Sequence, residues 1–345
     1  MRGMKGDIGF DEIKNGISNP KMALRFAYNN ILRQNLYRVP LTYISTHSTI
    51  GTNVFSKDWD VLILLDTGRV DALEAVSSEY NFIENVDKVK SVGGASPEWI
   101  AATFVEKYSD TIQNTAYLSA NGSSNEILAK KSPANRTLDE SHTAYKLLAK
   151  HNTVDLENLG RHENIWKYKG KIETDGGNSQ NTATPPRFVT ERAIDVSRNY
   201  DYERLIIHYH QPHTPYIANA IKENRELYDY EENPIKYISK TGDFQTVWER
   251  YLDELRYVLD DVEILIKNLD AERLVISADH GEALDVWRGL HSIGSIHPKV
   301  RYVPWITTSA TDSGEYIPET KPPEKSEKTS SQSSEDLLKA LGYKF

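Results

Sequence analysis

The chain of 345 residues contains no cysteine. This absence excludes disulfide bonds, thiolate metal sites and a cysteine nucleophile. The chain also has no excess of positive charge, because 41 lysines and arginines are set against 50 aspartates and glutamates, giving a formal net charge of −9. A protein that binds nucleic acid through its phosphates needs a basic face. We therefore expect no nucleic-acid partner, whereas a small anionic substrate is compatible with this composition.

Long hydrophobic runs are absent as well. The longest, such as VLILL at 61–65, fall far short of the ~20 apolar residues that a membrane-spanning helix needs. The N-terminal stretch 1–17 lacks the apolar core of a signal peptide. Hydrophobic residues make up 39% of the chain and charged residues 26%, which is a globular composition. We expect a cytoplasmic protein without an integral membrane segment.

Apolar runs bounded by polar residues predict strands. Four segments have this pattern: 61–65 (VLILL), 115–121 (TAYLSAN), 204–210 (RLIIHYH) and 273–279 (RLVISAD). Between the last two lies 251–270, in which apolar residues recur every three or four positions, as in a helix that covers a sheet. Strands that alternate with helices predict an α/β sandwich.

We expect one main domain at 56–317, with insertions, to account for most of the chain. Residues 1–55 are polar with helical patches and predict an N-terminal helical arm packed on this core. Residues 120–200 carry few strand signals and predict a cap or insertion. Residues 318–345 begin with the Pro, Ser, Lys and Glu composition of a flexible linker and end in a short helix.

Two of the predicted strands end in a carboxylate, Asp66 and Asp279, and the second is followed directly by His280. In open α/β sheets, ligands bind just beyond the carboxyl ends of the strands. Two carboxylates and an imidazole suit a divalent metal such as Zn, Mn, Mg or Ca. The alternative is that Asp66 caps the next helix and that Asp279 and His280 form a turn.

Histidines gather in one part of the sequence, with six of the ten between His208 and His297. His208 and His210 are two residues apart, so on a strand they share one face. His213 follows on a loop that Pro212 and a further proline stiffen. The alternative is that the first two histidines pack near the sheet and the third lies on a surface loop.

Ser96 is the candidate nucleophile. It follows two glycines and precedes Pro97, and 98–108 then predicts a helix. A serine at this place can simply cap the helix. The same geometry also favours a bound anion, and a serine beside a metal has its pKa lowered enough to attack an ester.

These segments together resemble a known family. LILLDTGRVDAL, GASPEWI, HQPHTPY, ISADHGEAL and HPKVRYVPWI resemble, in order, the motifs of the alkaline phosphatase superfamily. They are most similar to its sulfatase-like hydrolases and transferases from archaea and bacteria, over roughly residues 55–310. The resemblance implies a three-layer α/β sandwich with a mixed central sheet flanked by helices and a site at the strand ends.

The resemblance also implies roles for single residues. Asp66, Asp279 and His280 match the metal ligands of the family, and Ser96 matches its nucleophile, which also touches the metal. His213 matches the histidine that contacts the substrate oxyanion or the leaving group.

Further positions match less closely. His297 resembles the late histidine that closes the substrate site, with His291 as the competing choice, and His210 is a further candidate for contacting substrate. Arg69 either holds an oxyanion or pairs with Asp71 to fix the loop.

Two departures from the family pattern narrow the expected activity. Pro97 immediately follows Ser96 and no arginine lies nearby, so the motif for formylglycine formation is absent and that modification of Ser96 is unsupported. Tyr209 stands where two-metal relatives have an aspartate, which favours one-metal phosphotransferases. We expect a metal-dependent hydrolase or transferase of phosphate or sulfate esters, acting on a small-molecule or glycan ester such as a glycolipid head group. The alternatives are a sulfatase with an unusual nucleophile and a non-catalytic binding relative.

Overall fold

The computed structural model describes residues 50–129, 151–168, 183–284 and 291–323, together with Tyr43 and Leu148. In this part of the chain, seven strands form one sheet in the order β2-β7-β6-β1-β5-β3-β4. The strands are β1 (Val61–Leu65), β2 (Asp87–Lys90), β3 (Thr115–Ser119), β4 (Arg161–Asn164), β5 (Arg204–Tyr209), β6 (Ala271–Ser277) and β7 (Tyr302–Ala310). The sheet is mixed because β7 runs antiparallel to β2 and β6, whereas the other pairs are parallel. All four predicted strands are present.

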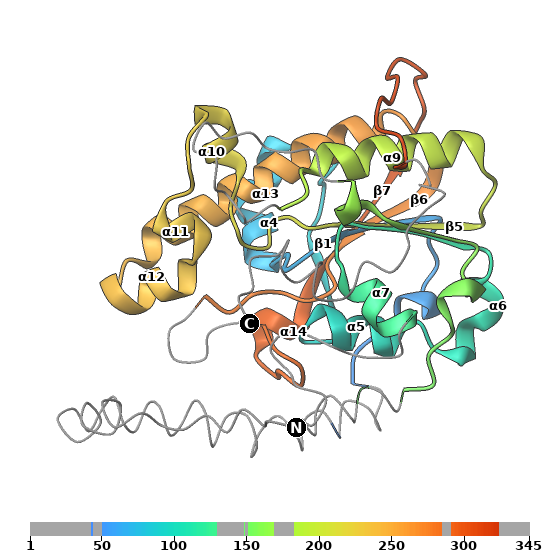
Figure 1. Ribbon diagram of the computed structural model, residues 1–345, viewed down its shortest axis with the longest axis horizontal. Helices are drawn as coiled ribbons and strands as arrows, with labels where there is room; N and C mark the ends of the chain where they lie inside the picture. The colour runs from blue at the N-terminus through green and yellow to red at the C-terminus, as the bar shows by residue number, and fades with distance from the viewer. Residues whose placement is uncertain are drawn as a thin grey trace, which may run out of the picture.

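Helices cover both faces of this sheet (Figure 1). One face carries α4 (Val70–Val76), α9 (Pro186–Asn199) and α13 (Phe244–Ile266), and the other carries α5 (Ser96–Thr103), α6 (Ser109–Ile112) and α7 (Ser123–Leu128). Side chains of β1 alternate between the two layers: Ile63 and Leu65 pack in the cluster with α9 and α13, and Leu62 and Leu64 in the cluster with α5. The predicted three-layer sandwich with a mixed central sheet is confirmed.

Helix α13 has the apolar stripe that the sequence predicts. Tyr251, Leu255 and Leu259 lie on it and are fully buried in the cluster between α13 and the sheet. The helix begins seven residues before 251, the predicted start, because the carboxylate of Asp243 accepts a hydrogen bond from the Thr246 N–H and caps it (3.0 Å).

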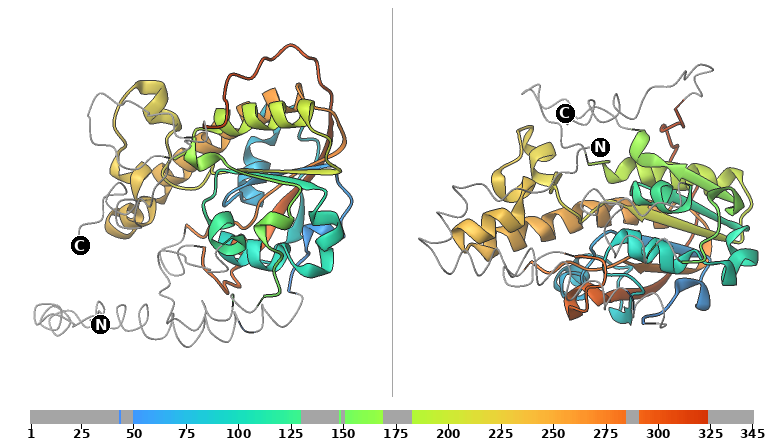
Figure 2. Two further views of the ribbon diagram at one scale, coloured as in Figure 1. Left: turned by 45° about the vertical axis from the view of Figure 1, so that its right-hand side comes forward. Right: turned by 60° about the horizontal axis from the view of Figure 1, so that its bottom comes forward.

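Helices α10 (Ala218–Glu223), α11 (Asp229–Glu232) and α12 (Pro234–Thr241) lie around the first half of α13, beyond one end of the sheet (Figures 1 and 2). Strand β5 leads into them, so this is the end at which the parallel strands finish. The short α14 (Pro298–Arg301) contacts β7. Among the described helices, none has both the length and the apolar character needed to cross a bilayer.

The predicted division into an arm, a catalytic domain and a tail stays a prediction. Residues 1–42, 44–49 and 324–345 lie outside the described residues, so the N-terminal arm and the C-terminal helix are not described. Within 120–200, which we expected to form a cap, β4 joins the sheet and α9 covers it. This range therefore contributes to the three layers as well as to any insertion.

Candidate metal and nucleophile site

Three parallel strands deliver acidic and imidazole side chains to one level of the sheet. In the pairing of β1 with its neighbours, Leu64 lies beside His208 of β5 and beside Ser277 of β6. Asp66 lies two residues after Leu64, and Asp279 lies two residues after Ser277. Because side chains alternate along a strand, both carboxylates point to the face that α5 covers. The strand register thus places the two aspartates side by side.

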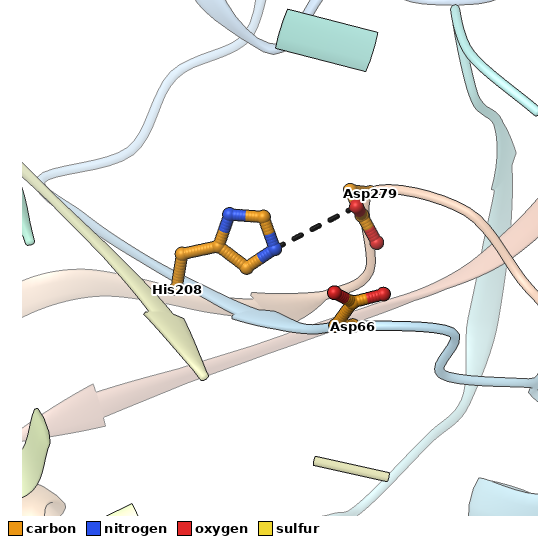
Figure 3. A group of neighbouring side chains, drawn as sticks. All are labelled: Asp66, His208 and Asp279. Atoms are coloured by element: carbon orange, nitrogen blue, oxygen red, sulfur yellow. Dashed lines mark ion pairs between the residues drawn. The ribbon is translucent and has the colours of Figure 1, made fainter. Parts of the chain in front are cut away.

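Ligand atoms of Asp66, His208 and Asp279 all lie within 4.8 Å of one another, and the three side chains are buried (Figure 3). Asp66 Oδ1, His208 Nε2 and Asp279 Oδ2 have no hydrogen-bond partner among the described residues. The dashed line joins His208 Nε2 to Asp279 Oδ2, which are 3.6 Å apart, and this distance is too long for a hydrogen bond. Buried polar atoms without partners are rare in folded proteins. Three of them facing one point fit the ligand set of a cation.

The outer atoms of the same three side chains are fixed. Asp66 Oδ2 accepts a hydrogen bond from Asn121 Nδ2 (2.8 Å), and His208 Nδ1 pairs with the hydroxyl of Tyr117 (2.8 Å). Asp279 Oδ1 accepts from the next main-chain N–H (2.8 Å). Partners of this kind orient metal ligands in proteins. The residues present therefore fit a divalent cation.

The charges of the two aspartates are coupled. Burial raises the pKa of Asp66 well above its ordinary value, and the neighbouring Asp279 raises it further. Burial also acts to raise the pKa of Asp279, but His280 and His208 outweigh it and hold that pKa below its usual range. A bound cation would relieve the repulsion between the two carboxylates.

His280 and Ser96 lie beside this pair. His280 Nε2 is 3.4 Å from Asp279 Oδ2, 3.7 Å from Asp66 Oδ1 and 3.2 Å from Ser96 Oγ. The ring Nδ1 of His280 is 3.0 Å from the carbonyl of Gly281. A carbonyl can only accept, so Nδ1 carries the proton and Nε2 presents a lone pair to the site. The four residues that we predicted around the metal, Asp66, Ser96, Asp279 and His280, are thus brought together.

Ser96 is the first residue of α5 and does not cap it. The capping position is occupied by Ala95, which makes no side-chain cap. The Ser96 hydroxyl instead faces His280, and its side chain is only 6% exposed. The helix is shorter than the predicted 98–108 because it ends at Thr103.

Four histidine rings form a row beside the aspartates. Ring centroids are 4.6 Å apart between His280 and His291, 5.1 Å between His291 and His213, and 5.0 Å between His213 and His210. Burial lowers the pKa of His210 to about 4. Burial also lowers the pKa of His213, with added repulsion from His210 and His291. The predicted substrate-contacting residues His210 and His213 therefore adjoin the metal site.

Between the two candidates for the late histidine, it is His291 that lies in this row. Its Nδ1 donates to Glu282 Oε2 (2.8 Å), and its main-chain N–H donates to Glu282 Oε1 (2.9 Å). His297, by contrast, precedes α14, where its ring Nδ1 accepts a hydrogen bond from the Lys299 N–H (3.2 Å). The geometry therefore favours His291 over His297 as the histidine of the site.

Arg69 is committed to its own loop. Its Nε and Nη2 donate to the two carboxylate oxygens of Asp71 (2.9 and 2.6 Å), and the guanidinium lies 4.7 Å from the ring centre of Trp248. The side chain is 2% exposed. Of the two roles that we considered for Arg69, pairing with Asp71 is the one observed.

The sequence did not predict that His208 is a candidate metal ligand. It indicated only that His208 either packs near the sheet or shares a face with His210. It also missed Asn121 and Glu282, which hold Asp66 and His291. Asn121 carried a usable signal, because it is the last residue of the predicted strand 115–121 and so falls at the same edge of the sheet as Asp66. Glu282 lies within the motif around His280, but its partner is set by tertiary structure.

No family model matches the sequence, and no curated protein matches it. The fold is similar to that of the soluble domain of lipooligosaccharide phosphoethanolamine transferase A from Neisseria meningitidis, at 14% identity and a TM-score of 0.45, covering 73% of this chain and 76% of that domain. A putative sulfatase from Bacteroides thetaiotaomicron has 13% identity and a TM-score of 0.41, with 76% of this chain and 66% of that one covered.

Two further structures are also similar in fold to this chain. The integral membrane form of the Neisseria transferase is 12% identical with a TM-score of 0.44; the match covers 87% of this chain and 60% of that protein. The C-terminal periplasmic domain of EcEptC from Escherichia coli, in a complex with Zn, is 11% identical with a TM-score of 0.37, and 76% of each chain is covered. At these identities and TM-scores, no activity, substrate or metal is carried over to this chain. The structural neighbours include phosphoethanolamine transferases, sulfatases and a protein from Vibrio parahaemolyticus described as a member of the alkaline phosphatase superfamily.

Proposed function

We propose that this chain is a metal-dependent enzyme that hydrolyses or transfers phosphate esters through Ser96, with sulfate esters as the second substrate class. One observation carries the proposal. Asp66 Oδ1, Asp279 Oδ2 and His208 Nε2 face one another without hydrogen-bond partners in the described part of the chain, and the Ser96 hydroxyl lies at the same place.

The ligand set consists of Asp66, Asp279 and His280, with His208 as an additional ligand. Two carboxylates with imidazole nitrogens suit Zn or Mn. Each of these side chains is oriented by a second contact, which supports a rigid site rather than one that forms only on binding.

Held by these side chains, a divalent cation would neutralise the carboxylates and lower the pKa of the Ser96 hydroxyl, which would then lose its proton to water. Ser96 Oγ then bonds to the phosphorus atom while the bond from phosphorus to the leaving oxygen breaks. His291, held by Glu282, is placed to give a proton to the leaving oxygen. Water, or the hydroxyl of an acceptor, finally displaces Ser96 from the phosphorus; the attacking oxygen gives its proton to His291 as the bond from phosphorus to Ser96 Oγ breaks.

For the natural substrate we propose a glycan or glycolipid head group. Tyr228, Tyr230 and Tyr237 of the α11–α12 region contact one another beyond the strand ends, and the Tyr228 side chain is 49% exposed. Aromatic faces of this kind suit stacking against sugar rings.

The test compares purified wild type with Ser96→Ala and with Ser109→Ala, which alters the first residue of α6 on the same face of the sheet. Metal content is measured by inductively coupled plasma analysis. Turnover is measured with p-nitrophenyl phosphate, bis-p-nitrophenyl phosphate and p-nitrophenyl sulfate in the presence of Mn or Zn. We expect Ser96→Ala to keep its metal and lose turnover, and Ser109→Ala to behave as wild type.

The same panel separates the competing functions. Turnover of the sulfate ester alone would indicate a sulfatase with an unmodified serine. Metal binding without turnover of any ester would indicate a binding relative. Wild-type turnover by Ser96→Ala would remove Ser96 from the mechanism.

A further inference from the structure

Glu98 is a buried glutamate that takes no part in the proposed chemistry. Its side chain is fully buried, and Oε2 accepts hydrogen bonds from the main-chain N–H groups of Gly94 (2.8 Å) and Gly294 (2.9 Å). Gly94 lies in the loop that leads to Ser96, and Gly294 lies in the loop that follows His291. One carboxylate oxygen therefore joins the loop of the nucleophile to the loop of the site histidine.

The two loops are also in direct contact. A Cβ added at Gly94 would lie 2.7 Å from the carbonyl oxygen of Ser292 and 2.9 Å from the side chain of Ser295. Only glycine fits this approach. The nucleophile loop is tied to the metal strand as well, because the Ser91 hydroxyl donates to the carbonyl of Asp279. The position of the nucleophile loop relative to the loop that follows His291 depends on the contacts at Glu98 and Gly94.

The other oxygen of Glu98 faces a buried cation. Oε1 lies 3.6 Å from Nη1 of Arg301, which is 3% exposed and ends α14. An ionised acceptor makes stronger hydrogen bonds than a neutral one. The carboxylate that accepts from both glycine N–H groups is therefore also in contact with a buried guanidinium.

We propose that Glu98 is a positioning residue that fixes the Ser96 hydroxyl relative to His291 by holding these two loops together. The inference rests on the proposed function, in which Ser96 attacks and His291 protonates the leaving oxygen. A misplacement of about 1 Å between reacting groups can cost about 100-fold in rate.

Three variants separate the hydrogen bonds of Glu98 from its charge. Glu98→Gln retains a carbonyl oxygen that can accept from both glycines, Glu98→Ala retains none, and Glu98→Ala/Arg301→Met also removes the cation left unpaired. We expect Glu98→Ala to lower kcat by about 100-fold, with a smaller change in KM and unchanged metal affinity. Glu98→Gln should recover most of kcat, and the double variant should not.

The opposite pattern would overturn the inference. If Glu98 only neutralises Arg301, the double variant recovers kcat and Glu98→Gln is as impaired as Glu98→Ala. Glu163→Gln is the matched control, since Glu163 is another buried glutamate paired with arginines, Arg161 and Arg192. This control should lose stability and keep kcat per folded molecule.

A second measurement does not depend on activity. Amide hydrogen exchange is followed by NMR on protein labelled with ¹⁵N-glycine. In Glu98→Ala, the amides of Gly94 and Gly294 should both exchange at least about 10-fold faster, and those of Gly242 and Gly314, which have open surroundings, should not change. Unchanged exchange at Gly94 and Gly294 would refute the inference even in an active enzyme. Conversely, a wild type without ester turnover would refute the proposed function and leave the exchange result to decide the role of Glu98.

Discussion

Asp66 and Asp279 occupy equivalent places on neighbouring parallel strands, each two residues beyond a paired position of the sheet. Both carboxylates are buried, and one oxygen of each has no hydrogen-bond partner within the described residues. Two buried negative charges at one level repel each other unless a proton or a cation intervenes.

Added divalent cation should therefore raise the melting temperature. At a concentration 100 times its Kd, a ligand of the native state stabilises it by about 2.7 kcal/mol, which corresponds to several degrees. We expect this shift in wild type after chelation and reloading with Zn or Mn, measured by calorimetry. Asp66→Asn and Asp279→Asn should lose it, and Asp312→Asn, which alters a carboxylate paired with Arg198 away from the site, should keep it. An undiminished shift in both site variants would argue against the metal centre.

The second prediction concerns the hydrogen bond between Tyr117 and His208 (2.8 Å). If Nε2 of His208 binds the cation, Nδ1 carries a proton and donates it to the Tyr117 hydroxyl oxygen. Tyr117→Phe should then weaken metal binding by about 10–100-fold in titration calorimetry. Tyr80→Phe is the matched control, because the Tyr80 hydroxyl bonds to Asp260 and to the Arg256 carbonyl. Equal affinities in the two variants would make His208 a packing residue.

The third prediction tests whether His291 or His297 acts as the proton donor at the site. His291→Gln should lower kcat on a p-nitrophenyl ester by about 10²–10⁴-fold, the usual contribution of a proton donor. His297→Gln alters a ring outside the row of histidines, whose Nδ1 accepts from the Lys299 N–H, and should change kcat little. A large loss in His297→Gln with normal turnover in His291→Gln would restore the original choice of His297.

The fourth prediction starts from a buried carboxyl group outside the site. Glu254 Oε2 accepts a hydrogen bond from the Ala218 N–H (2.8 Å), whereas Oε1 has no partner among the described residues. Oε1 of the adjoining Gln211 likewise has no hydrogen-bond partner among the described residues, whereas the amide Nε2 of Gln211 donates to the carbonyl of Thr184 (3.0 Å). Burial raises the pKa of Glu254 to about 8. Protonation removes the charge from this buried carboxyl group, so burial favours the neutral form in the native protein.

The sign of the pH effect follows from these pKa values. The ordinary pKa of a glutamate is 4.5, so between about pH 4.5 and 8 the unfolded chain loses this proton and the native protein retains it. The contribution of Glu254 to the free energy of unfolding therefore falls as pH rises through this window, by a few kcal/mol in total. Glu254→Gln mimics the protonated form and should remove the fall.

The measurement is urea unfolding of wild type and Glu254→Gln at pH 5, 6.5 and 8. The free energy of unfolding of Glu254→Gln minus that of wild type should increase as pH rises. A constant difference, or greater destabilisation of the variant at high pH, would show that Glu254 is charged in the native protein.

Much of the sheet was predictable because its central strands are buried on both faces. Such strands read as continuous apolar runs, as β1 does in VLILL. Since parallel strands finish at one edge, the meeting of Asp66 with Asp279 and His280 followed from the same pattern. The edge strands were not predictable: β2 (DKVK) and β4 (RHEN) are polar, and only their pairing with a neighbour makes them strands.

His208 shows a second limit of sequence reasoning. A histidine inside an apolar strand reads the same whether it packs against aromatic rings or binds a cation. The difference lies in the Tyr117 hydroxyl on one side and the Asp279 carboxylate on the other, and both come from distant strands. Similarly, the choice between His291 and His297 depended on Glu282, which the linear spacing does not locate.

Helix α13 belongs to two parts of the molecule. Its second half lies on the sheet through Leu255, Leu259 and Val262, and its first half carries α10, α11 and α12 beyond the strand ends. The surroundings of the site are therefore built on a different stretch of helix from the one that stabilises the strands with the ligands. We expect exposed positions of 218–241, such as Tyr228, to tolerate substitutions that change specificity, whereas Ile238 of this segment belongs to the core and should not.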